Sequence, residues 1–319
     1  MDDPDRRVFQ HAYYIGNYLS GILYGLELVL YFLIIRNLRR RKTVGSRVWR
    51  FSAIFGTLGF VLLTIDVSCN AVWGEIMWIE AAKNPGGVST FLNTQVSVWY
   101  QTLGSASIIA LIFTGDALLL HRLFIIWGSN FLIMIIPVLA YLAAFALAIT
   151  QLVWAGTPHG NFFIGKSRNF GIPYYAITIG LNIIVTGLIW GRIVRLNRAL
   201  FKLPEDDHPW RFHTNPYSIF IESAALYSLF GIIFLVPYAM QSQTSIAFGQ
   251  MWAKLAGISP QLIILRMISG RAWSKEKIRQ AESTLNVPSV LPPVDVEVAL
   301  EEGRDDSSGK SNRLNQFIE

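Results

Sequence analysis

The sequence has little cysteine and little charge. Its single cysteine, Cys69, excludes an intrachain disulfide and any metal site built from several thiolates. Only 15% of the 319 residues are charged and 52% are apolar, whereas an ordinary soluble domain carries roughly 25% charged residues. The mean hydropathy is +0.40. A soluble domain could not cover its surface with so few charges, so the composition predicts a protein that lies largely in a membrane.

Motifs for several kinds of chemistry are also missing. The histidines form no H-E-x-x-H pair, so no metal is expected, and without a glycine-rich nucleotide loop no cofactor is expected either. The acidic run at 205–207 lies in a polar connection, where we interpret it as solvated rather than magnesium-binding. Lys254 is the one candidate for the Schiff-base lysine of a retinal protein, but its place in the first two turns of its span does not favour that role.

Seven apolar stretches are each long enough to cross a bilayer, which takes about 20 helical residues. They cover residues 13–35, 51–74, 98–121, 131–154, 172–194, 217–240 and 248–268. None alternates with the period of a barrel strand. The sequence therefore predicts an all-α fold with a seven-helix membrane domain over residues 1–283. Residues 284–319, rich in Pro, Ser and acidic side chains, are predicted to be a disordered cytoplasmic tail.

The basic residues fall mainly on one side of the predicted bundle. Eighteen of the 27 Lys and Arg residues lie in the connections 36–50, 122–130 and 192–216, at the end of the seventh span or just after it, and six, Lys254 among them, are assigned to the other side. Since cytoplasmic connections are enriched in Lys and Arg, the N-terminus is predicted outside and the C-terminus in the cytoplasm. The 36–50 connection is interpreted as a topology signal and a contact for anionic lipid, not for nucleic acid. The plasma membrane is the expected location.

Glycines and prolines within the spans bear on helix packing. Two pairs of glycines, four residues apart, either let helices approach closely or simply face lipid: Gly21 with Gly25, and Gly187 with Gly191. Three prolines are predicted to kink their helices, because each removes a backbone hydrogen bond: Pro137, Pro237 and Pro260. Kinked helices can open cavities, although a kink can also be merely tolerated.

Polar side chains at membrane depth are the candidates for a functional site, because each is costly there unless it is paired or hydrated. The candidate ligand-binding residues are Asp66, Asn70, Asp116, Asn182 and Gln261. Glu27 is a further carboxylate within a span. We expect Asp66 and Asp116 to face the interior of the bundle. A structural hydrogen-bond network explains these residues as well as a ligand, ion or catalytic site does.

Arg122 and Glu222 form a candidate switch pair. Arg122 lies at the inner end of the third span, and Glu222 lies about one and a half turns into the sixth span from the same side. Opposite charges at that depth are expected to pair and to tie the two helix ends together. A ligand near Pro237 could swing the inner end of the sixth helix and break the pair. Alternatively, Arg122 extends to lipid phosphates and Glu222 bonds to a hydroxyl.

Three segments resemble a known group of proteins: GDALLLHRLFIIWGSN at 115–130, IESAALYSLFGIIFLVPY at 221–238 and ISPQLIILRMISGRAW at 258–273. The chain resembles, over roughly residues 10–275, a large group of fungal, mainly basidiomycete, seven-span membrane proteins with no assigned activity. That resemblance implies a seven-helix fold. The layout is also similar to that of G-protein-coupled receptors, but the chain has His121-Arg122-Leu123 where those receptors have an acidic-Arg-aromatic triplet, and Ser259-Pro260 where they have Asn-Pro.

We interpret the protein as receptor-like, sensing a small, apolar ligand and signalling to a cytoplasmic partner. A membrane-embedded enzyme acting on a lipid or terpenoid is one alternative, although catalysis is less favoured. A transporter is another alternative. The sequence shows no internal repeat that relates its two halves, which argues against a transporter. Several outer aromatic residues either line a ligand entrance or form an interfacial belt: Trp73, Trp99, Tyr100, Tyr174, Tyr175 and Tyr238.

The distribution of basic residues predicts the topology. A tag at the N-terminus should be reached by antibody from outside intact cells, and a tag placed after residue 280 only after permeabilisation, because the basic connections stay in the cytoplasm. Labelling both termini from the same side would contradict seven spans.

Overall fold

The computed structural model describes residues 3–40, 46–83, 90–91, 97–128, 130–157, 165–200 and 218–268. The described residues form helices and turns without a strand, and a long helix coincides with most or all of each predicted span. In chain order these are α1 (Asp3–Arg40), α2 (Ser46–Glu75), α4 (Trp99–Ile126), α5 (Phe131–Gly156), α6 (Gly165–Leu200), α7 (Ser218–Ala239) and α8 (Ser245–Ile268). A π-helix, η1 (Ile76–Glu80), and a 3-10 helix, η2 (Ala81–Lys83), follow α2. The predicted tail at 284–319 lies outside the described residues.

Five of these helices are long and apolar enough to cross a membrane: α1, α2, α4, α5 and α6. Their outward faces carry large apolar side chains, such as Leu132 and Ile136 on α5, which are 77% and 73% exposed. A continuous apolar surface of this kind requires a covering that water does not provide. The fold therefore indicates a multi-pass membrane protein.

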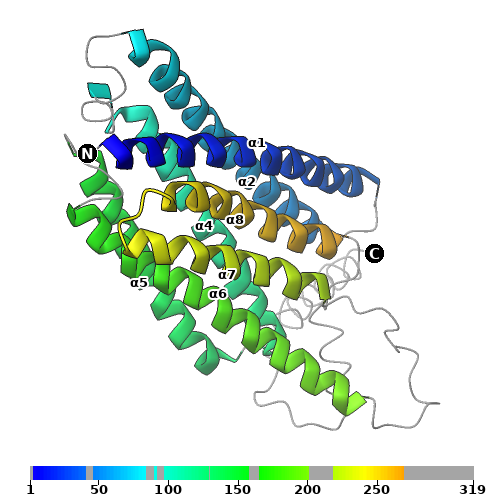
Figure 1. Cartoon of the computed structure of the whole chain (residues 1–319). Helices are drawn as coiled ribbons and strands as arrows, with labels where there is room; N and C mark the ends of the chain where they lie inside the picture. Colours follow the sequence, from blue (N-terminus) through cyan, green and yellow to red (C-terminus); the bar gives the residue numbers. More distant parts are fainter. Residues whose placement is uncertain are drawn as a thin grey trace, which may run out of the picture.

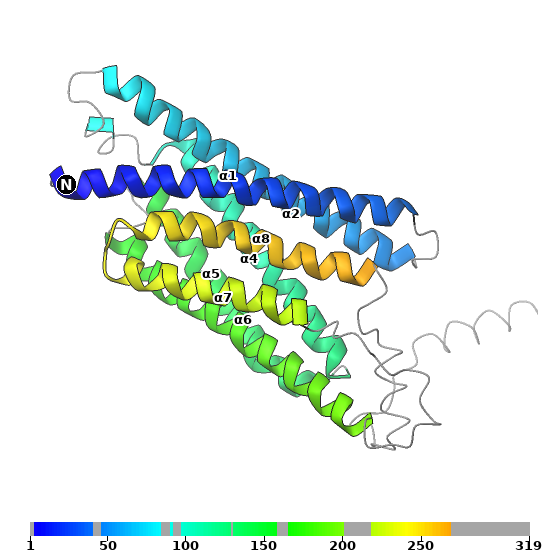
Figure 2. The same cartoon turned by 45° about the vertical axis from the view of Figure 1, so that its right-hand side comes forward.

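The helices form a closed ring in chain order, in which α8 returns to pack against α1 (Figures 1 and 2). α4 stands nearest the middle, because it contacts α6 and α8 across the ring as well as its neighbours α2 and α5. α1 and α8 run side by side and in the same direction, so the residues of one meet residues of the other at equal spacing. This parallel pair, with α2 beside it, forms one half of the bundle.

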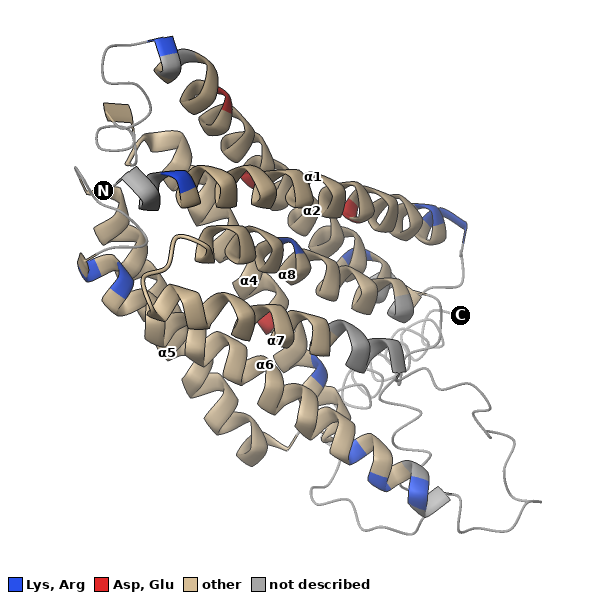
Figure 3. Ribbon diagram, in the orientation of Figure 1, with Lys and Arg blue, Asp and Glu red and all other residues tan. Residues whose placement is uncertain are grey.

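Several helices extend beyond the predicted spans. α1 begins ten residues before the predicted start at 13, and α6 begins at Gly165 instead of 172 and continues to Leu200. The last turns of α6 project past the neighbouring helices, and Lys and Arg gather there and at the end of α1 (Figures 1 and 3). The early start of α6 places Pro173 inside that helix. The three predicted prolines, Pro137, Pro237 and Pro260, lie inside α5, α7 and α8.

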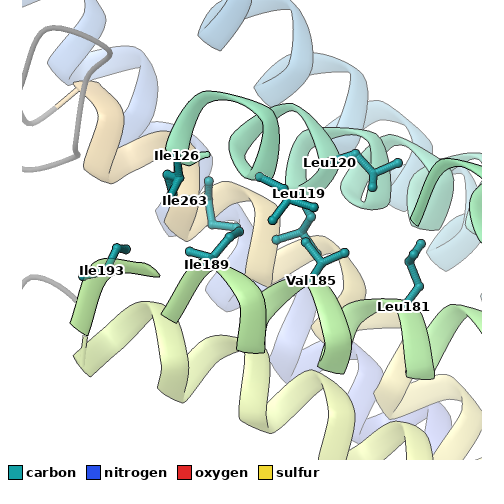
Figure 4. Close-up of a cluster of buried hydrophobic side chains, with 9 residues drawn as sticks. Leu119, Leu120, Ile126, Leu181, Val185, Ile189, Ile193 and Ile263 are labelled. Carbon is teal, nitrogen blue, oxygen red and sulfur yellow. The ribbon is translucent and has the colours of Figure 1, made fainter. Parts of the chain in front are cut away.

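An aliphatic cluster joins α4, α6 and one residue of α8 in the half of the bundle where these helices end (Figure 4). α6 contributes four side chains spaced every four residues, which places them along one face of the helix. The labelled members are Leu119, Leu120, Ile126, Leu181, Val185, Ile189, Ile193 and Ile263. Because lipid tails are as apolar as these side chains, close dispersion contacts hold the helices here, not the removal of water.

The glycines that allow helices to approach are not the predicted pairs. Around each of the predicted glycines, Gly21 with Gly25 and Gly187 with Gly191, a Cβ atom would meet nothing within 4 Å, so these pairs join no helices among the described residues. The close approach occurs instead at Gly115 of α4, where a Cβ atom would lie 2.9 Å from Cγ of Pro260 and 3.7 Å from the carbonyl oxygen of Ala256. The missing side chain lets α4 and α8 meet at the Pro260 ring.

Substitution of Gly115 by Leu should therefore lower the thermal stability of the detergent-solubilised protein. The rigid proline ring cannot move aside, and overpacking of this kind costs about 1–3 kcal/mol. Gly180 of α6 is the matched control, because a Cβ atom there meets nothing within 4 Å. Gly180→Leu should leave the Tm close to that of the wild type, and equal falls for the two variants would contradict the assigned contact.

Candidate functional site

A buried ion pair joins α2 to α8. The Lys254 ammonium donates to Oδ2 of Asp66, and the two side chains are 2% and 6% exposed. The sequence analysis counted Lys254 among the basic residues outside the membrane, and this was wrong. Lys254 lies in the third turn of α8, inside the bundle. The burial of Asp66 and of Asp116 confirms that both carboxylates face inward.

Asn70 orients the Asp66 carboxylate from one turn further along α2. Its Nδ2 donates to Oδ1 of Asp66 at 2.9 Å, so both carboxylate oxygens of Asp66 have a partner. From α1, the Tyr13 hydroxyl donates to the backbone carbonyl of Asn70 at 2.8 Å, and Asn17 donates to the same oxygen at 3.4 Å. The network ties α1, α2 and α8 together, and we call it the α1–α2–α8 seam.

Glu27 lies in the same seam without such partners. Its side chain is fully buried, and neither carboxyl oxygen has a hydrogen-bond partner among the described residues. The carboxyl group faces Gly257 of α8, where a Cβ atom would lie 3.1 Å from Oε1 of Glu27.

A second set of buried polar side chains includes Asp116 of α4. Asp116 lies within electrostatic range of the hydroxyls of Tyr174 on α6 and Tyr227 on α7, and these two hydroxyls lie within range of each other. Within the described part of the chain, four of the group's polar atoms have no hydrogen-bond partner: Oδ2 of Asp116, the hydroxyls of Tyr174 and Tyr227, and Nε1 of Trp252 on α8. Burying such atoms unsatisfied costs about 1–3 kcal/mol each, so the arrangement is suited to a molecule that supplies the missing bonds.

Aromatic ring contacts link three of these side chains, those of Tyr174, Tyr227 and Trp252. The ring of Trp252 lies 5.4 Å from that of Tyr227 and 5.6 Å from that of Tyr175, and Tyr175 lies 4.7 Å from Tyr174. The hydroxyl of Thr178, one turn after Tyr174 on α6, is buried and likewise unpartnered among the described atoms. We call Asp116, Tyr174, Thr178, Tyr227 and Trp252 the aromatic site.

Gln151 of α5 closes the end of this site nearest the α7–α8 turn. Its Nε2 donates to the hydroxyls of Tyr238 and Tyr175 at 3.3 and 3.4 Å, and its backbone carbonyl oxygen accepts from the Ser167 hydroxyl at 3.1 Å. Gly171 is required beside it, because a Cβ atom there would overlap the Tyr238 hydroxyl. Tyr174 and Tyr238 are thus interior residues, whereas Trp99, at 76% exposure, has the surface position expected of a belt.

The predicted ligand-binding residues fall into separate places. Asp66 and Asn70 bond to each other in the seam, while Asp116 belongs to the aromatic site. Asn182, one turn beyond Thr178, accepts a hydrogen bond from Ser228 of α7 at 3.3 Å. Gln261 is buried in α8, and its amide has no partner among the described groups. The described contacts do not join these five residues into a single ring.

The candidate switch pair is only half described. Nη2 of Arg122 donates to the backbone carbonyl of Ile263 at 2.9 Å, which ties the last turns of α4 to α8. The side chain of Glu222 lies outside what the structure describes. The pairing of Arg122 with Glu222 therefore stays a prediction.

The sequence analysis did not identify several residues of the seam and of the aromatic site, although the sequence pattern pointed to some of them. Lys254 is an ionisable residue within an apolar stretch, which is itself a signal for a buried partner. Tyr174, Thr178 and Asn182 recur every four residues and so share one face of α6. Tyr227 and Trp252 carry no such signal, because a tyrosine or tryptophan in a span fits lipid as well as the interior.

Comparisons with known proteins add no function. No family model, curated protein or solved structure matches the chain. Among the described residues, no three His, Cys, Asp or Glu side chains come together as a metal site would require.

The ion pair predicts a strong effect of Lys254→Met. Removing one partner of a buried pair costs about 3–5 kcal/mol, because the other charge is left uncompensated. We expect a large fall in Tm for this variant. Adding Asp66→Asn should recover most of it, since the amide is neutral and its oxygen can still accept from Asn70. A double variant no more stable than Lys254→Met would contradict the pairing.

Proposed function

We propose that the chain is a receptor-like protein of seven membrane-spanning helices that binds a small, mainly apolar ligand in the aromatic site. In this proposal the N-terminus lies outside the membrane and the basic helix ends face the cytoplasm. The observation that carries the proposal is the set of unpartnered polar atoms that four helices, α4, α6, α7 and α8, bring into one aromatic surrounding. Ligand sites are commonly apolar pockets with a few convergent polar groups.

The chemistry of the site indicates the class of ligand. The rings of Tyr174, Tyr175, Tyr227 and Trp252 offer apolar faces, while hydroxyl, indole and carboxylate groups offer both donors and acceptors. A compact hydrocarbon skeleton with one alcohol or carbonyl group matches this combination. The body would pack on the rings, and the polar group would satisfy atoms that otherwise lack partners.

Thr178 provides the test of this ligand class. Purified protein is titrated with linear and terpenoid alcohols and ketones and with their parent hydrocarbons, and binding is read from the shift in Tm. The oxygenated compounds should give the larger, saturable shifts. Thr178→Val should raise the Kd of the best compound about threefold to tenfold, the worth of one hydrogen bond.

Thr64 of α2 is the matched control for this test. Its hydroxyl is already bonded to the carbonyl oxygen of Phe60 at 2.8 Å and to Tyr24 at 3.0 Å, away from the aromatic site. Thr64→Val should leave the Kd unchanged. Equal effects of the two valine variants, or no saturable shift with any compound, would refute the assigned site.

Signalling is a separate part of the proposal, and the fate of the bound compound distinguishes it from the alternatives. Ligand-stimulated nucleotide exchange on a heterotrimeric G protein added to protein in nanodiscs would support the receptor. Recovery of a chemically altered compound would instead support an enzyme, and its accumulation inside proteoliposomes a transporter. Within the receptor proposal, Arg122 and Glu222 remain the switch pair at the inner ends of α4 and α7.

A further inference from the structure

The seam holds two buried carboxylates and one buried cation. Asp66 is bonded to Lys254, whereas Glu27, fully buried on α1, has no hydrogen-bond partner among the described residues. Lys254 is also the one Lys or Arg that is buried as a whole residue in the described part of the chain. An isolated carboxylate at such a place is costly, so the position of Glu27 relative to Lys254 matters.

Gly257 fixes that position. A Cβ atom on Gly257 would lie 3.1 Å from Oε1 of Glu27 and 3.5 Å from Cδ2 of Leu63. Lys254 precedes Gly257 by three residues on α8, and Asp66 follows Leu63 by three residues on the antiparallel α2. Residues three apart are neighbours on one helix face. The Lys254–Asp66 pair therefore lies one helical turn from the Glu27 carboxyl group, on the side of the seam nearer Tyr13.

The parallel packing of α1 on α8 supports the same register. Ser20 bonds to the carbonyl of Gln250 at 3.4 Å, and Glu27, seven residues further along α1, faces Gly257, seven residues further along α8. Lys254 thus stands between the two contacts on the shared face. Its flexible four-carbon stem lets the ammonium move without movement of the backbone. Gly257 itself adds no side chain beside Glu27, where a Cβ atom would lie 3.4 Å from Cδ2 of Leu111.

We propose that Glu27 is a second counter-ion for Lys254, and that the ammonium transfers from Asp66 to Glu27 when the charge of Asp66 is lost or its position shifts. The transfer moves one positive charge by about one helical turn along the seam. It gives the bundle two arrangements of the same three residues, each with the cation paired. The observations behind this two-state element do not include the ligand proposed for the aromatic site.

Four variants test the transfer through their Tm values: Asp66→Asn, Glu27→Gln, the two combined, and the combination with Lys254→Met. Each single variant leaves Lys254 one carboxylate, so each fall in Tm should be small, and smaller for Asp66→Asn than for Lys254→Met. The double variant leaves the ammonium without a carboxylate, and its fall should clearly exceed the sum of the two single falls. Adding Lys254→Met should then restore stability, because no unpaired charge remains.

Asp116 is the matched control, being a buried carboxylate on α4 outside the seam. The falls for Asp66→Asn and Asp116→Asn should add when combined, as expected for independent sites. Additive falls for Asp66→Asn and Glu27→Gln would overturn the proposal. Gly257→Ala offers a second variant, since its methyl group would stand 3.1 Å from Oε1 of Glu27 and should lower the Tm further in Asp66→Asn than in the wild type.

Poor folding of Asp66→Asn also has a defined meaning. If that variant does not accumulate while Asp66→Asn with Lys254→Met does, Glu27 fails to take the ammonium and the proposal is overturned. If neither accumulates, the coupling is measured with Asp66 intact, from Glu27→Gln, Lys254→Met and the two combined. Non-additive Tm changes there support the transfer, and additive changes overturn it.

Discussion

The pairing of Lys254 with Asp66 is the constraint to which one half of the bundle conforms. A charge removed from water needs a partner with good geometry, and each oxygen of that partner needs a bond of its own. Lys254 and Asn70 occupy the two oxygens of Asp66, and Tyr13 and Asn17 then hold the backbone of Asn70. This requirement fixes the register of α2 against α1 and α8, which packing of interchangeable aliphatic side chains would leave loose.

The other half of the bundle follows a different rule. Around Asp116 the polar atoms are left without partners, while the aromatic rings about them are closely packed. The oxygens of Asp66 are satisfied within the chain, whereas the unpartnered atoms of the aromatic site are the ones to which the proposed ligand would bond. The contrast matters because burial alone does not distinguish the two: Asp66 and Asp116 are 4% and 3% exposed.

The sequence predicted the helices because a long apolar run is a local property, and each predicted span falls on a helix. It missed the ends, since polar turns continue a helix that its neighbours support, as at the start of α6. The close contacts could not be predicted, because Gly115 and Gly257 work through residues far along the chain while the regularly spaced Gly21 and Gly25 face open space. The predicted burial of Asp66 and Asp116 is confirmed. That one lies in the seam and the other in the aromatic site depends on how the ring of helices closes, which the sequence does not reveal.

α8 is the element that belongs to both halves. Trp252 enters the aromatic site and Lys254 the seam, and residues two apart on a helix point to nearly opposite sides. In the proposal, a ligand bound against Trp252 would turn or shift α8. Because Lys254 follows two residues later on the same helix, the shift would also change its distance to Asp66 relative to Glu27. Pro260 lies further along α8, against Gly115, and the hydrogen bond it lacks makes that point the natural pivot. Movements of one to two ångströms, about the size of helix shifts in known switches, suffice to exchange hydrogen-bond partners, so one rigid helix can carry a change between the two places without a chain of intermediate residues.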